Sequence, residues 1–206
     1  MNPDTIEQIA RTHMLNQKTH TGREPGWIFY HGLRTARIAE EICGLLNLDI
    51  DKDVVFTGAL FHDICKDNEP HNETGADLTE KLLADYFPGE ELARIGQVIR
   101  LHNQRTKDND YPLEVKVVQD ADLIDHAGPI NAWLAFYWSG SYDETIDDHI
   151  RFINGEENIM WIEKLRAQLN FDVSIALYDE RIRWQDRFFE MFRKVYLEGV
   201  WHDGSI

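Results

Sequence analysis

The sequence is poor in positive charge and in cysteine. Among its 206 residues, 21 lysines and arginines stand against 37 aspartates and glutamates, which gives a formal net charge of -16. A protein that wraps duplex nucleic acid needs clustered cations on its surface, so we expect no duplex partner. The two cysteines, Cys43 and Cys65, lack CxxC spacing, which argues against a disulfide framework or a zinc ribbon.

Long apolar runs and a targeting signal are also missing. No stretch approaches the roughly 18 apolar residues that a membrane span requires, and no cationic start followed by an apolar segment opens the sequence. We therefore expect a cytoplasmic protein without a membrane partner. The length favours one domain over residues 1–206, and homo-oligomerisation stays open.

Alternating strand patterns are absent as well, because apolar residues recur at steps of three and four almost throughout. This periodicity predicts an all-α, single-domain helical bundle. The expected helices are Pro3–Leu15, Trp27–Asn47, a third capped by Asp51 or Asp53, a fourth capped by Asn72, a fifth from Glu90 to about His102, and a sixth through Val115 and Asp122. Further helices are expected over residues 129–206, and the first of them, "INAWLAFYW", is expected to be buried. The six tryptophans are assigned to the core and to helix packing rather than to a base-stacking platform.

Histidine, by contrast, is abundant, with nine in the chain. Four predicted helices each bring a polar residue that can bind a metal to an inward position. A lone buried histidine usually just finds partners for its ring nitrogens, but burying an ionised aspartate without a partner costs on the order of several kcal/mol. Several such side chains converging from separate helices therefore favour a metal site, and they are His31, His62 with Asp63, His102 and Asp122.

Imidazole and carboxylate together suit Mn, Fe, Co, Ni or Zn, and no thiolate is at hand to select zinc. Such an ion lowers the pKa of a bound water to about 7 and polarises a phosphoryl oxygen. The residue types therefore predict a hydrolytic centre with one or two divalent transition-metal ions.

The order of these residues resembles the HD superfamily of metal-dependent phosphohydrolases. The matching segments are "YHGLRTARIAEEI" with His31, "LFHDICKD" with His62 and Asp63, and "VVQDADLIDHAG" with Asp122. The resemblance spans about residues 27–128, and residues 129–206 only loosely match the trailing helices of the family. It implies an HD-type helical domain that hydrolyses a phosphoester or phosphoanhydride of a small phosphorylated metabolite, expected to be a nucleotide.

Two further histidines resemble those of HD subfamilies that bind two metals. His71 begins "HNETGADL" and His102 lies in "VIRLHN", where these subfamilies place additional ligands. The resemblance then implies a dinuclear centre with Asp63 bridging both ions, as in the symmetrical diadenosine-tetraphosphate hydrolases and the cyclic-nucleotide phosphodiesterases. The "GYP" signature of the cyclic-dinucleotide enzymes is absent, which disfavours that substrate.

Two cations stand close to these motifs. Lys66 resembles a lysine that follows the doublet in several of these families and could hold a phosphate oxygen or stabilise a leaving group, or it could be a solvated lysine at a helix end. Arg34 could reach a phosphate too, or pair with a carboxylate such as Glu40 or Asp67. We assign Asp63 and Lys66 to catalysis and Arg34 and Lys66 to substrate binding.

The remaining polar residues are less defined. Asp122 follows the helical phase of Val115 and Val118, whereas Asp120 and Asp125 are either acceptors that fix ligand imidazoles or exposed helix acids. The other histidines are expected to be structural or superficial: His13, His20, His126, His149 and His202.

Two alternatives remain for the function. Some HD-superfamily members are di-iron oxygenases with the same type of ligand set. A third possibility is a non-catalytic helical module that binds a nucleotide. Elemental analysis and a nucleotide screen separate the three.

Overall fold

The computed structural model describes residues 2–17, 23–106 and 109–199, and these contain ten helices and no strand, which confirms the all-α prediction. Within them, no helix combines the length and apolar character needed to cross a membrane. In chain order the helices are α1 (Pro3–Met14), α2 (Trp27–Leu46), α3 (Lys52–Phe61), α4 (His71–Leu83), α5 (Gly89–Leu101), α6 (Leu113–Asp125), α7 (Pro129–Ser141), α8 (Ile146–Ile153), α9 (Glu156–Gln168) and α10 (Asp172–Glu198).

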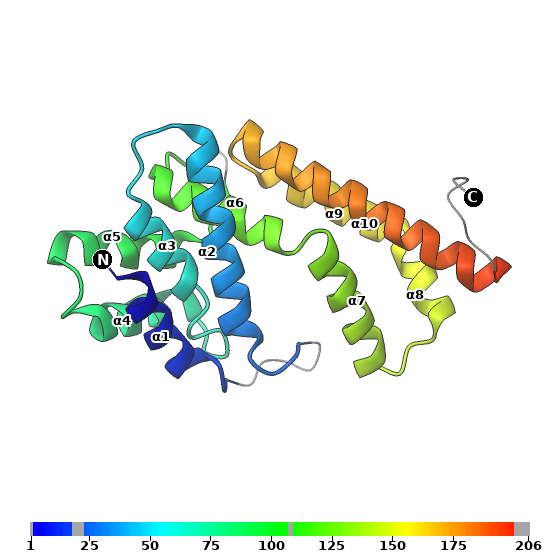
Figure 1. Cartoon of the computed structure of the whole chain (residues 1–206), viewed down its shortest axis with the longest axis horizontal. Helices are drawn as coiled ribbons and strands as arrows, with labels where there is room; N and C mark the ends of the chain where they lie inside the picture. The colour runs from blue at the N-terminus through cyan, green and yellow to red at the C-terminus, as the bar shows by residue number, and fades with distance from the viewer. Residues whose placement is uncertain (1, 18–22, 107–108, 200–206) are drawn as a thin grey trace.

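Among the first six helices, α2 packs against α3 and α6 (Figure 1). Helix α3 also packs on α5, which pairs with α4, and α1 covers α2 and α3. The other helices extend to one side, with the 27-residue α10 running beside α9 and contacting both α6 and α7. The first six helices thus enclose one apolar core, and α10 connects the rest to it through α6.

Most predicted helix ends are close to the observed ones. Asp51 caps α3, because its side chain accepts from the backbone N–H groups of Asp53 and Val54 at 3.2 Å. The predicted cap at Asn72 is wrong: α4 begins one residue earlier, at His71, and the Asn72 amide donates to the carbonyl oxygen of Arg100 at 2.7 Å. Asn72 thus ties α4 to α5 instead of starting a helix.

The prediction of a buried α7 is wrong. Only Ala132, Leu134 and Ser139 are buried in it, while Trp133 and Trp138 are 49% and 42% exposed. The tryptophans in general are not core residues, because Trp27 alone is buried among the five that the structure describes. Several large apolar side chains of α7 are therefore exposed at the surface.

Candidate metal centre

Helices α2 to α6 bring all six predicted ligands together. His31 lies on α2, His62 and Asp63 directly follow α3, His71 begins α4, His102 follows α5, and Asp122 lies on α6. Each of them except Asp122 is less than 9% exposed, and the side chain of Asp122 is 13% exposed. Separate helices thus converge on one buried point, as the sequence predicted.

Two glycines allow this convergence, because they let helix backbones touch beside the ligands. A Cβ on Gly32 would lie 2.3 Å from the carbonyl oxygen of Leu60, so α2 and α3 meet next to His31 and His62. A Cβ on Gly58 would lie 2.6 Å from the side chain of Val98, where α3 meets α5. Only glycine fits at these two crossings.

One group of donors lies around His31. Its Nε2 is 3.1 Å from Nε2 of His62 and 3.1 Å from Oδ1 of Asp122. The Oδ2 atom of Asp63 lies 3.6 Å from His62 Nε2 and 3.9 Å from His31 Nε2. The donor atoms of His31, His62 and Asp63 lie close enough together to hold one ion, and Asp122 lies beside them against His31.

A second group uses the other oxygen of Asp63. Its Oδ1 lies 3.6 Å from His71 Nε2 and 3.5 Å from His102 Nε2. The His71 Nε2 atom is buried and has no hydrogen-bond partner among the described residues. A buried nitrogen without a partner costs free energy unless something else binds it, and a metal ion meets that need.

The outer ring nitrogens fix which way the imidazoles donate. His62 Nδ1 donates to the carbonyl oxygen of Ala59, and His102 Nδ1 donates to that of Ile99, both at 2.7 Å. His31 Nδ1 donates to Oδ2 of Asp125, also at 2.7 Å. These bonds direct the Nε2 lone pairs of the three rings toward the shared centre.

Burial and charge shift the pKa values of these groups in different directions. Burial lowers the pKa of His62 to about 3. Burial also acts to lower the pKa of His31, but hydrogen bonds to Asp122 and Asp125 outweigh it and raise this pKa to about 9. Burial acts to raise the pKa values of Asp63 and Asp122, yet the neighbouring histidines and cations hold both well below the usual range. Both carboxylates are therefore ionised at neutral pH, and the donor set fits divalent transition-metal ions.

The two predicted substrate-binding cations pair with aspartates of the centre. Lys66 Nζ lies 3.0 Å from Oδ1 of Asp63 and remains 37% exposed. Arg34 forms a two-pronged bond to Asp125, with Nε at 2.8 Å and Nη2 at 3.0 Å, and its guanidinium lies 4.8 Å from the ring centroid of Trp27. Its carboxylate partner is thus Asp125, and neither Glu40 nor Asp67 as named from the sequence.

The two undecided aspartates have different positions. Asp125 accepts from the His31 ring, which is one of the two roles considered for it. Asp120 has neither of the two roles considered for it. It is fully buried and accepts hydrogen bonds from the backbone N–H groups of Asn170 and Phe171, which precede α10. Asp120 therefore anchors the C-terminal helices to α6.

Sequence reasoning missed two residues of this centre. His126 groups with His31 and Asp122, and its Nδ1 donates to the backbone oxygen of Asp122 at 2.9 Å. Arg105 forms an ion pair with the Asp122 carboxylate. The four-residue step from Asp122 to His126 was a usable signal, since it equals about one helical turn, but nothing in the loop sequence pointed to Arg105.

His13 and His149 lie away from the centre, as expected, although His149 is buried rather than superficial. The predictions for His20 and His202 fall outside the described residues.

Comparison with known proteins agrees with this geometry. The family model of the HD domain matches residues 28–127, the segment that contains every residue of the centre. Residues 28–127 of the chain form an HD domain. Residues 129–199 of this HD protein form the additional C-terminal helices α7 to α10.

Solved structures share the fold of this HD protein over nearly its whole length. An HD-superfamily hydrolase from Bacillus thuringiensis covers 94% of this chain and 96% of its own, with 20% identity and a TM-score of 0.69. YpgQ of Bacillus subtilis, solved in complex with ADP, covers 94% of this chain and 97% of its own, with 21% identity and a TM-score of 0.66. A predicted HD-superfamily hydrolase from an uncultured Thermotogales bacterium gives 20% identity and a TM-score of 0.64, with coverage of 94% and 92%. No curated protein matches the sequence of this HD protein.

Proposed function

We propose that this protein is a metal-dependent phosphohydrolase that cleaves a phosphoester or phosphoanhydride of a nucleotide. The observation that carries the proposal is the position of Asp63, whose two carboxylate oxygens face two separate groups of imidazole nitrogens. A carboxylate placed in this way suits a pair of ions, each with its own histidines. We assign the metal ligands as His31, His62, Asp63, His71, His102 and Asp122.

The ions, when bound, would supply Lewis acidity toward a phosphoryl oxygen and a water acidic enough to attack at neutral pH. The protein's own part is to hold that charge in a buried place and to aim the ligands. Asp63 and Asp122 provide the negative charge, and the backbone carbonyl oxygens of Ala59 and Ile99 hold the His62 and His102 rings in place.

Lys66 and Arg105 provide positive charge at the edge of the same centre. Each contacts an aspartate of the ligand set, Asp63 and Asp122 respectively. A phosphate group brought to the ions would come within reach of these flexible side chains, which can stabilise charge that gathers during phosphoryl transfer. We therefore assign Lys66 to catalysis and substrate binding. Arg34 contributes to substrate binding only from the flank, because Asp125 holds its guanidinium.

The proposed nucleotide substrate is supported by fold likeness to YpgQ, which was solved in complex with ADP. It is supported independently by an aromatic cavity beside the centre. The net charge of -16 fits a small ligand drawn in by local cations and metal ions better than a long polyanion.

The test combines metal analysis with turnover. Protein purified without added metal is analysed for its elements and then assayed on a nucleotide panel with Mn, Co, Ni, Mg or Fe. The Asp63→Ala variant should lose bound metal and at least about a hundredfold in turnover, whereas Asp110→Ala, at a fully exposed aspartate, should change neither. Unchanged metal content and turnover in Asp63→Ala would refute the proposal. Turnover with Mn or Co under anaerobic conditions would exclude a di-iron oxygenase.

A further inference from the structure

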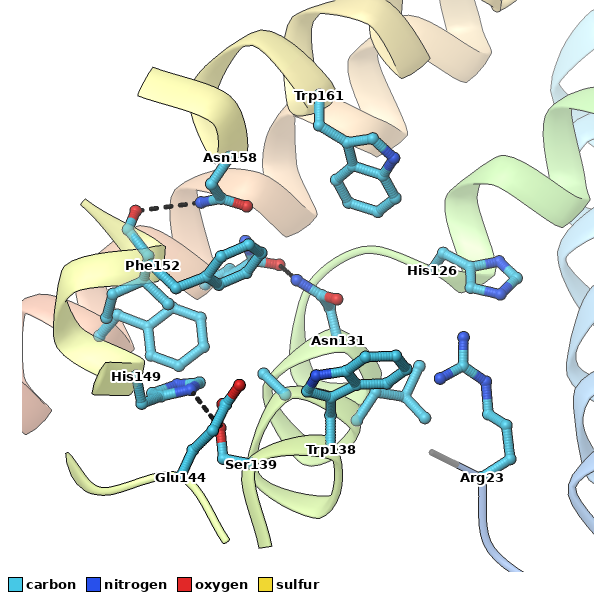
Figure 2. A pocket seen from close by; sticks show the side chains of 15 residues that line it. Arg23, His126, Asn131, Trp138, Ser139, Glu144, His149, Phe152, Asn158 and Trp161 are labelled. Carbon is cyan, nitrogen blue, oxygen red and sulfur yellow. Dashed lines mark hydrogen bonds between the residues drawn. The ribbon is translucent and has the colours of Figure 1, made fainter. Parts of the chain in front are cut away.

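A cavity of about 370 Å³ adjoins the metal centre, and its size falls within the range of about 300–1,000 Å³ that is usual for small-molecule sites. Helices α7, α8, α9 and α10 form its walls (Figure 2). His126 belongs both to the lining of this cavity and to the donor group with His31 and Asp122. The cavity therefore opens where the ions are expected.

Aromatic rings dominate the walls. Trp138, Phe152 and Trp161 line the cavity, although each is 42% to 55% exposed, which is unusual for such large apolar side chains in a protein without a partner at that surface. Arg23 also lines the cavity, and its guanidinium points toward His126 (Figure 2). Flat apolar walls with a cation beside His126 suit a planar ring that carries a phosphate.

One side of the cavity contains a set of hydrogen bonds that fixes the tautomer of His149. The hydroxyl of Ser139 donates to Oε2 of Glu144 at 2.8 Å, which uses its only proton. Ser139 Oγ must then accept from His149 Nδ1, which lies 3.0 Å away. His149 Nε2 is consequently a lone-pair acceptor, and this buried atom has no hydrogen-bond partner among the described residues.

Two asparagines add acceptors to the same walls. Asn158 Nδ2 donates to the carbonyl oxygen of Ile153 at 3.0 Å, and Asn131 Nδ2 donates to Oε1 of Gln185 at 2.9 Å. Each nitrogen keeps one further N–H group, and each amide oxygen can accept a hydrogen bond from a ligand. Three acceptors line the cavity, namely His149 Nε2, Asn158 Oδ1 and Asn131 Oδ1, and His149 Nε2 is the buried one without a hydrogen-bond partner among the described residues.

We propose that this cavity holds the base of the nucleotide and selects bases with an exocyclic amine, whose N–H groups donate to His149 and the asparagine oxygens. The inference rests on the proposed function, because it places the phosphates of the same ligand toward His126 and the ions. The aromatic rings stack on the faces of the base, and the acceptors contact its edge.

The amine is tested with two ligands that differ only there and in which a methylene group replaces the phosphoanhydride oxygen. Calorimetry with Mn²⁺ present compares the α,β-methylene diphosphates of adenosine and of purine riboside, which lacks the 6-amino group. The wild-type protein should bind the adenosine compound about tenfold more tightly, because a base without the 6-amino group leaves a buried acceptor without a partner. His149→Phe, whose ring still packs against Phe136 and Phe189, should bind the two compounds with equal affinity.

Stacking is tested with a pair of matched tryptophans. Trp161 lines this cavity and is 42% exposed, whereas Trp184 lines a different one and is 46% exposed. Trp161→Ala should weaken binding of the adenosine compound about tenfold to a hundredfold, and Trp184→Ala should leave it unchanged. Since both residues are half-exposed, neither variant depends on repacking the core.

The outcomes separate this inference from the proposed function. Equal affinity of the wild-type protein for the two compounds, or equal effects of the two tryptophan variants, would overturn the base site even if Asp63-dependent hydrolysis of phosphoesters were found. The predicted amine preference with no hydrolysis of any nucleotide would support the base site and refute the hydrolase.

Discussion

Neutralising Asp125 tests how much its hydrogen bonds to His31 and Arg34 contribute to the metal centre. The Asp125 carboxylate is fully buried and accepts three hydrogen bonds, from His31 Nδ1 at 2.7 Å and from Nε and Nη2 of Arg34 at 2.8 and 3.0 Å. Asp125→Asn keeps the shape but removes the charge, and it turns an N–H₂ group toward at least one of these donors. We therefore expect both a weaker fold and a worse metal site.

The magnitude follows from burial. Breaking one partner of a buried ion pair costs about 3–5 kcal/mol, because the other charge stays buried without compensation. Loss of a hydrogen bond behind a ligand histidine lowers metal affinity about tenfold to a hundredfold. We expect Asp125→Asn to lose about 3 kcal/mol in the free energy of unfolding at pH 7 and at least about tenfold in Mn²⁺ affinity.

The pH dependence has a definite sign. Burial alone would raise the pKa of Asp125, but His31 and Arg34 lower it below the usual range of about 4. The stabilisation from this carboxylate is therefore present above about pH 4 and is lost as the pH falls below it. The difference in unfolding free energy between the wild-type protein and Asp125→Asn should therefore shrink as the pH falls below about 4.

A matched pair on the surface supplies the control. Arg166 forms the same two-pronged bond to Asp179, at 2.7 and 2.8 Å, but both side chains are substantially exposed. Asp179→Asn should cost less than about 1 kcal/mol in urea unfolding and leave Mn²⁺ titrations unchanged. Equal losses of stability in the two variants, or an unaltered Mn²⁺ affinity in Asp125→Asn, would contradict the reasoning.

Three further predictions concern other parts of the centre. Gly32→Ala should cost at least about 2 kcal/mol in chemical denaturation, because its Cβ would meet the Leu60 oxygen at 2.3 Å, whereas Gly44→Ala on the same helix, with nothing within 4 Å, should stabilise by about 0.5–1 kcal/mol. Because the pKa of His31 is raised to about 9 and Mn²⁺ requires its lone pair, binding at pH 7.5 should release about one proton; enthalpies that are equal in Tris and Hepes buffers would speak against this. Lys66→Met should lower kcat on nucleotides about a hundredfold while Mn²⁺ stays bound, and an unchanged kcat would reduce Lys66 to a surface residue.

The sequence was informative where helical periodicity decides the outcome. The steps of three and four that placed His31, His102 and Asp122 on inward faces also placed them at the centre, because a helix that buries one face fixes the direction of every side chain on it. The choice of Asp122 over Asp120 as the residue facing the centre followed from the same geometry. Their roles as ligands remain predictions.

Periodicity could not predict which apolar helix faces pack against another helix. Leu45 continues the apolar stripe of α2 but is 53% exposed near the end of that helix, and α7 is rich in apolar residues yet leaves Trp133 and Trp138 exposed. Pairs such as Arg34 with Asp125 join residues 91 positions apart, and a single sequence contains no information on which carboxylate an arginine will meet. Such contacts depend on packing between helices, which local patterns do not record.

Asp120 and Asp122 of "DADLID" show how one helix can contact both halves of the molecule. Residues two apart on an α-helix are separated by about 200° around its axis, so Asp120 and Asp122 point to opposite sides of α6. Asp122 faces the ligand histidines, while Asp120 receives the backbone of Asn170 and so fixes the start of α10, the helix that carries Gln185 into the cavity wall. Helix α6 therefore links the metal centre to a helix that lines the cavity.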